Sequence, residues 1–110
     1  MSERVAVAGV DDLAEGLGTK VEALGHRIAL FRVGEDVYAI GDRCSHAEAS
    51  LAEGELFDLE VECPRHGSEF DITTGEPGSL PATRPVPVYE VEVDHGQVFL
   101  HLDPIDEEDS

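Results

Sequence analysis

The sequence has no tryptophan, two cysteines and few basic residues. Of its 110 residues, seven are lysine or arginine and 25 are aspartate or glutamate, giving a formal net charge of −18. A chain this acidic repels phosphate backbones and anionic lipid surfaces, so we expect neither nucleic acid nor a membrane as partner. The acidity either serves solubility alone or steers a partner that carries a basic docking surface.

Long apolar runs and a basic N-terminal region are also missing. Residues 1–15 contain one short apolar run, Val5–Ala8, which is followed by Asp11 and Asp12. A signal peptide or a membrane helix needs a much longer apolar stretch. We therefore expect a soluble, cytoplasmic monomer with a single domain over residues 1–102. Five acids and one proline in residues 103–110 predict a disordered acidic tail.

Short apolar segments separated by glycine-containing turns predict an all-β protein. A turn at 94–97 joins two alternating segments and indicates a closing hairpin. A helical turn is expected at 12–16, and His26 is expected to be a solvated turn residue. The expected strands cover residues 4–8, 20–24, 27–33, 37–40, 59–62, 86–93 and 98–102.

The two cysteines lie in two short motifs of similar composition, Cys44-Ser45-His46 and Cys63-Pro64-Arg65-His66. Thiolate sulfur and imidazole nitrogen together suit zinc or an iron–sulfur core. Zinc fingers usually place both cysteines on one arm and both histidines on the other, whereas each arm here offers one of each. A mixed arm suits a two-iron cluster with chemically different ends, which is the ligand set of a Rieske [2Fe-2S] centre.

The residues after the second motif extend the similarity, namely Gly67–Asp71, Thr74-Gly75 and a proline loop that ends at Pro81-Ala82. With them, the sequence resembles the Rieske-type [2Fe-2S] ferredoxins of bacterial ring-hydroxylating dioxygenase systems. The resemblance implies the Rieske fold, an antiparallel β-sandwich base with a loop-rich cluster-binding subdomain at about 41–81.

The resemblance also implies one [2Fe-2S] cluster. Cys44 and Cys63 would bind one iron, and His46 and His66 would bind the other. In the related respiratory proteins a disulfide joins the two loops, at positions that are Ala49 and Arg65 here.

Those respiratory proteins also carry a tyrosine where this chain has Phe70, and the tyrosine hydroxyl donates a hydrogen bond to a cluster-bound sulfur. Phe70 cannot donate, whereas Ser68 is retained. Donors to the sulfurs stabilise the reduced cluster, so losing one lowers the reduction potential. We predict a potential at or below ~0 mV, within the range of about −150 to +300 mV for Rieske centres.

The chain lacks the other parts of an oxygenase system. A catalytic subunit needs a second iron held by two histidines and a carboxylate, and the spacing of His26, His95 and His101 is unsuitable for it. No glycine-rich fingerprint for a flavin or nicotinamide follows a predicted strand. The resemblance therefore implies an electron carrier and not an enzyme, which passes one electron from a flavin-dependent ferredoxin reductase to a terminal non-haem iron oxygenase.

Two alternatives remain open. One is a Rieske small subunit or accessory protein for another redox system, nitrite-reductase-like or in iron–sulfur assembly. The other is a structural zinc-binding interaction module. Arg43 and Arg65, each next to a predicted ligand, either pair with carboxylates such as Glu48 and Glu69 or contact a docked partner.

Overall fold

The computed structural model describes residues 3–43, 50–64, 69–78 and 85–103, and in these ranges it confirms an all-β architecture. Two short 3-10 turns are present, η1 (Val10–Asp12) and η2 (Leu51–Glu53). The helical turn expected at 12–16 is instead η1, because Leu13 turns inward and is buried. The strands are β1 (Glu3–Gly9), β2 (Gly18–Ala23), β3 (His26–Val33), β4 (Asp36–Gly41), β5 (Leu56–Phe57), β6 (Glu60–Glu62), β7 (Glu69–Asp71), β8 (Val88–Asp94) and β9 (Gln97–Leu102).

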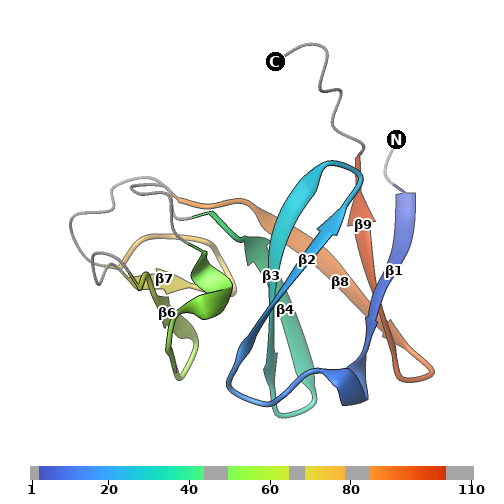
Figure 1. The fold of residues 1–110 in the computed structure, drawn as a ribbon, viewed down its shortest axis with the longest axis horizontal. Coiled ribbons are helices and arrows are strands. Elements are labelled where there is room, and N and C mark those ends of the chain that lie inside the picture. Colours follow the sequence, from blue (N-terminus) through green and yellow to red (C-terminus); the bar gives the residue numbers. More distant parts are fainter. Residues whose placement is uncertain (1–2, 44–49, 65–68, 79–84, 104–110) are drawn as a thin grey trace.

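Six strands form one antiparallel sheet in the order β1-β9-β8-β4-β3-β2, which curls over itself (Figure 1). Its two three-stranded halves are joined where β4 pairs with β8, at Ala39 with Tyr89 and Ile40 with Val88. The halves form the two layers of the predicted sandwich base.

Two tight turns fix the register of the hairpins in this base. Leu24 and Gly25 join β2 to β3, and His95 and Gly96 join β8 to β9. All four residues have positive φ, between 50° and 87°, as two-residue turns of type I′ require. The closing hairpin predicted around residues 94–97 is therefore confirmed.

A smaller sheet, in the order β5-β6-β7, lies beside the base (Figure 1). Strand β3 separates two apolar cores, because successive side chains of a strand point to opposite faces. Ile28 and Leu30 face the core inside the curled sheet, whereas Ala29 and Phe31 face the core shared with the smaller sheet. No helix in the described ranges is long and apolar enough to cross a membrane.

Candidate metal centre

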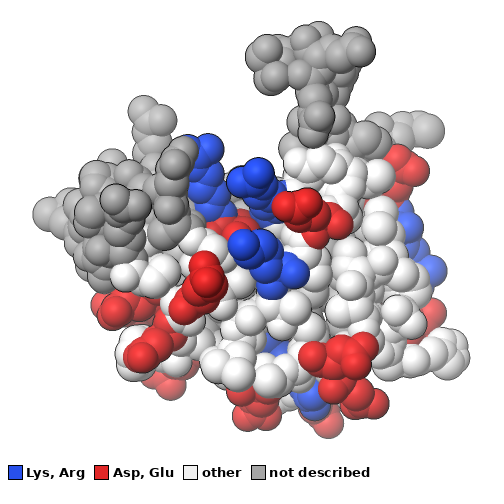
Figure 2. Space-filling model, in the orientation of Figure 1, with Lys and Arg blue, Asp and Glu red and all other residues white. Residues whose placement is uncertain are grey.

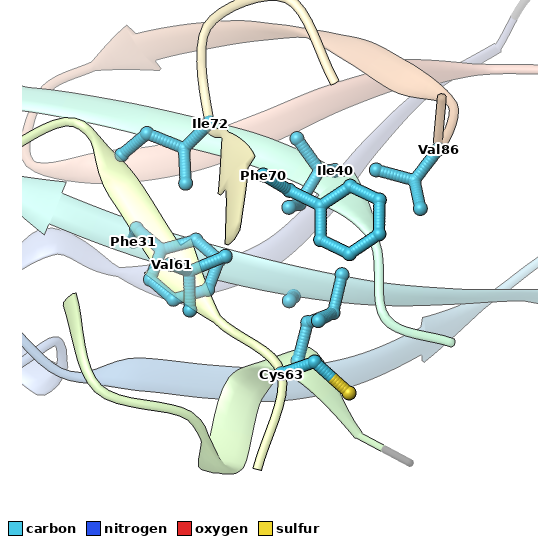
Figure 3. Close-up of a cluster of buried hydrophobic side chains, with 9 residues drawn as sticks. Phe31, Ile40, Val61, Cys63, Phe70, Ile72 and Val86 are labelled. Carbon is cyan, nitrogen blue, oxygen red and sulfur yellow. The ribbon is translucent and has the colours of Figure 1, made fainter. Parts of the chain in front are cut away.

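Cys63 follows β6 directly, as predicted, and its side chain is fully buried. Its thiol is not in a disulfide. Figure 3 shows it at one end of the core shared by the base and the smaller sheet. The other predicted ligands, Cys44, His46 and His66, lie outside the described residues. The buried members of this core are Ala29, Phe31, Ile40, Leu51, Val61, Cys63, Phe70, Ile72 and Val86.

The second motif is fixed at its base by strand pairing. Glu62 of β6 is paired with Glu69 of β7. The chain therefore leaves the smaller sheet after Glu62 and returns to it at Glu69, directly opposite. The N–H of Glu62 also donates to the carbonyl of Glu55 at 2.8 Å. Gly54 packs so closely here that a Cβ atom would lie 1.9 Å from the Glu62 carbonyl oxygen. The backbone leading into Cys63 is therefore held on two sides.

The first motif is fixed at its base by Asp42, which is buried with 4% of its surface exposed. Its Oδ1 accepts hydrogen bonds from the Ser50 hydroxyl at 2.7 Å and from the Ala52 N–H at 2.9 Å. Its carbonyl accepts from the Leu51 N–H at 2.6 Å, and Arg43 and Ser50 form an antiparallel bridge. The residues on either side of segment 44–49 are therefore held together.

The start of the proline loop is tied to β7 in the same way. Gly78 N–H donates to the Glu69 carbonyl at 2.7 Å, and Pro77 is bridged to Phe70. The turn between them is closed by Asp71, whose Oδ1 accepts from the Thr73 N–H at 2.7 Å and from the Thr73 hydroxyl. The hydroxyl contact is the main reason that the pKa of Asp71 lies below its usual value, although partial burial opposes it.

The remaining histidines, His26, His95 and His101, are dispersed over the base. His95 is an exposed turn residue, and His101 on β9 lies 3.1 Å from Glu92 through Nε2. The prediction that His26 is a solvated turn residue is wrong. Its ring lies between the Tyr89 hydroxyl at 3.1 Å and the Asp103 carbonyl at 2.6 Å. Sequence spacing gave no signal of this contact, which joins β3 to the end of β9.

The described part of the site fits a metal–sulfur centre. A buried thiol without a disulfide partner is available as a thiolate ligand, and soft sulfur suits an iron–sulfur core. The segments that flank the two motifs and the start of the proline loop all lie at the smaller sheet and η2. These elements are on one side of the sandwich base (Figure 1). Within the described ranges, no three or more His, Cys, Asp or Glu side chains are grouped to hold a metal ion.

Comparison with known proteins agrees with this centre. The family model of the Rieske [2Fe-2S] domain matches residues 3–90. The 3-phenylpropionate/cinnamic acid dioxygenase ferredoxin subunit of Escherichia coli K12 is 44% identical over 100 residues, which are 90% of this chain and 93% of that protein.

Solved structures give the same result. The ferredoxin of carbazole 1,9a-dioxygenase from Nocardioides aromaticivorans IC177 matches with a TM-score of 0.87 and 40% identity, covering 93% of this chain and 98% of that one. A ferredoxin in complex with the oxygenase of carbazole 1,9a-dioxygenase matches with a TM-score of 0.85 and 39% identity, covering 94% and 97%. This chain therefore belongs to the Rieske [2Fe-2S] family, as a ferredoxin of the dioxygenase type that holds one [2Fe-2S] cluster and carries electrons instead of catalysing a reaction.

Proposed function

We propose that this ferredoxin takes one electron from a flavin-dependent ferredoxin reductase and delivers it to a terminal non-haem iron oxygenase. One observation carries the proposal. The chain is similar, over more than nine tenths of its length, to a ferredoxin whose structure is a complex with a dioxygenase's oxygenase component. Partner choice resides in surfaces more than in the fold, so the proposal concerns the class of partner and not the substrate.

The ligands proposed for the cluster are Cys44 and Cys63 on one iron and His46 and His66 on the other. When bound, such a cluster accepts and releases one electron. The position of Cys63 supports this set, since its thiol is buried at the end of a paired strand. A cluster-binding subdomain over about 41–81 accommodates all four residues.

The chain's own contribution is to hold the residues that flank the ligand-bearing segments and to bury the Cys63 thiol. Asp42 and Gly54 fix the backbone at the two motifs. Phe70 is fully buried in the same core as Cys63, and its ring offers no hydrogen-bond donor. Burial and the lack of a donor both bear on the potential, and they support the prediction of a low-potential centre.

The ligand set is tested by counting iron in anaerobically purified variants. Cys63→Ser and His66→Ala should each lose most of the iron and the visible colour. His95→Ala is the matched control, because His95 is exposed in the β8–β9 turn, and it should keep both. A Cys63→Ser protein with full iron content would overturn the assignment.

The partners are tested by reconstitution with a flavin-dependent ferredoxin reductase and a terminal non-haem iron oxygenase from the same organism. We expect oxygenase turnover that requires this protein, which acts as a monomer in the cytoplasm and docks against basic surfaces. If instead only a nitrite reductase large subunit or an assembly protein accepts its electrons, the accessory-subunit alternative holds.

A further inference from the structure

Basic side chains gather on one face of this acidic molecule (Figure 2). They line a groove of about 490 Å³ between β2–β3 of the base and the segments around the first motif. Three of the seven basic residues of the chain, Lys20, Arg27 and Arg43, contribute to it. We call these three residues and the space between them the basic groove.

Two of the three basic residues lie on the side of the groove that the sandwich base forms. Lys20 lies on β2, and Arg27 lies on β3 directly opposite Glu22. Both cations are exposed, and the Arg27–Glu22 pair is long, at 3.8 Å, with each side chain about 70% exposed. Such a pair is weak in water, so it does not commit Arg27 to Glu22.

The other wall connects the groove to the predicted cluster. The Asp42 N–H donates to the Arg27 carbonyl at 3.0 Å, which holds the backbone that leads toward the first motif against β3. Arg43 follows Asp42 and immediately precedes the proposed ligand Cys44. A partner seated in the groove would therefore lie next to one of the cluster's ligands.

The charge balance in the groove differs from that of the chain. Among the described residues, its charged lining is three basic and three acidic (Glu22, Asp42 and Glu53), whereas the whole chain has 25 acids against seven bases. Asp42 is buried, and its Oδ1 already accepts two hydrogen bonds from the protein. The groove is therefore less acidic than the chain as a whole, and it repels carboxylates less.

From these observations we infer that the basic groove receives an acidic surface segment of the oxygenase, and that this contact orients the docked complex. The inference rests on the proposed function. The acidic remainder of the surface would attract a largely basic partner from any direction, whereas carboxylates in the groove select one orientation. Electron transfer falls steeply with distance, so only an orientation that brings the first motif close is productive.

The test compares two double variants with the same change in net charge. Lys20→Gln/Arg27→Gln removes two positive charges from the groove. Arg4→Gln/Gln97→Glu changes the charge by the same amount on β1 and β9, which lie on the side of the base away from the smaller sheet (Figure 1). The reduced proteins are oxidised in stopped flow by hexacyanoferrate(III), an anion, by hexaammineruthenium(III), a cation, and by the cognate oxygenase, each reagent taking one electron from the cluster.

At low salt the groove variant should react with hexacyanoferrate about three- to tenfold more slowly than the control variant, and with hexaammineruthenium no more slowly. Its transfer to the oxygenase should slow by a similar factor, and the differences should vanish at high salt. Equal rates for the two variants overturn the inference. A response to hexacyanoferrate alone makes the groove a site for small anions and overturns docking. Wild-type protein that reduces hexacyanoferrate but not the oxygenase overturns the proposed function itself, and docking with it.

Discussion

At the scale of single residues, Asp42 shows how one buried carboxylate shapes the first motif. Its Oδ1 accepts from Ser50 and Ala52, which lie beyond the segment that carries Cys44 and His46. A buried donor left without its acceptor costs the full desolvation penalty of that group. The stability of the loop base therefore depends on this side chain.

Asp42→Ala should lower the free energy of unfolding by about 2–4 kcal/mol, because it leaves two donors without an acceptor. The measurement is urea denaturation of the cluster-loaded protein. Asp36→Ala is the matched control, since it removes an exposed aspartate at the start of the same strand, β4. Equal losses in the two variants would show that Asp42 has no special role in the loop base.

Tyr89 and His26 form a second tie, between β8, β3 and the end of β9. The Asp103 carbonyl can only accept, so His26 Nε2 carries a proton and donates to it. In neutral His26 the Nδ1 atom then accepts from the Tyr89 hydroxyl. Tyr89→Phe keeps the edge-on ring contact with His26 but removes the hydroxyl, and should cost about 1 kcal/mol. Tyr38→Phe, on β4, should change stability by less, as measured by urea denaturation.

Burial raises the pKa of Tyr89 above its ordinary value of 10.0. The folded protein therefore holds this proton more tightly than the unfolded chain. The stabilisation is complete below pH 10 and is lost as the pH rises through the raised pKa of the folded protein. Spectrophotometric titration should show a tyrosine ionisation above pH 10 that Tyr89→Phe removes. A late ionisation that persists in Tyr89→Phe would contradict its assignment to this partly buried hydroxyl.

At the scale of elements, strand β6 delivers Cys63 because Gly54 lets two backbone segments come together. Both Gly54 and Gly9 have extended backbone angles that alanine adopts freely. A Cβ atom at Gly54 would strike the Glu62 carbonyl oxygen, whereas one at Gly9 would meet chiefly the mobile end of Asp12.

Gly54→Ala should therefore cost about 1–3 kcal/mol by overpacking and should lower the iron content per chain. Gly9→Ala should leave the iron content unchanged. Thermal unfolding and iron analysis on the same preparations measure the stability and the iron content of both variants. A Gly54→Ala protein with normal stability and full iron would mean that the close approach does not fix β6.

The sequence predicts elements that depend on local patterns better than it predicts contacts between distant segments. The alternation in residues 86–102 and the apolar run in residues 27–33 yield β8–β9 and β3, because strand periodicity and turn chemistry are encoded locally. The contact of His26 with Tyr89 and the pairing of β4 with β8 depend on how the sheet curls, so residue spacing could not reveal them. For the site, the two Cys/His motifs and the family resemblance they support predicted the cofactor, whereas the basic groove required three segments to be placed in space.

At the scale of the whole molecule, the net charge of −18 dominates long-range encounter. The rate at which this ferredoxin associates with a basic partner should fall as salt rises, since the Debye length shortens to about 8 Å at physiological ionic strength. Stopped-flow association with the cognate oxygenase, at several salt concentrations, measures this slope. A rate that is independent of salt would mean that the acidity serves only solubility.

The central claim is that a Rieske cluster makes this protein an electron carrier. The most direct test is visible absorption and low-temperature EPR of the anaerobically purified protein, before and after reduction with dithionite, with iron and zinc counted on the same sample. We predict a red-brown protein with about two irons per chain whose reduced form gives a Rieske EPR signal. A colourless, EPR-silent protein that holds one zinc per chain would contradict the account.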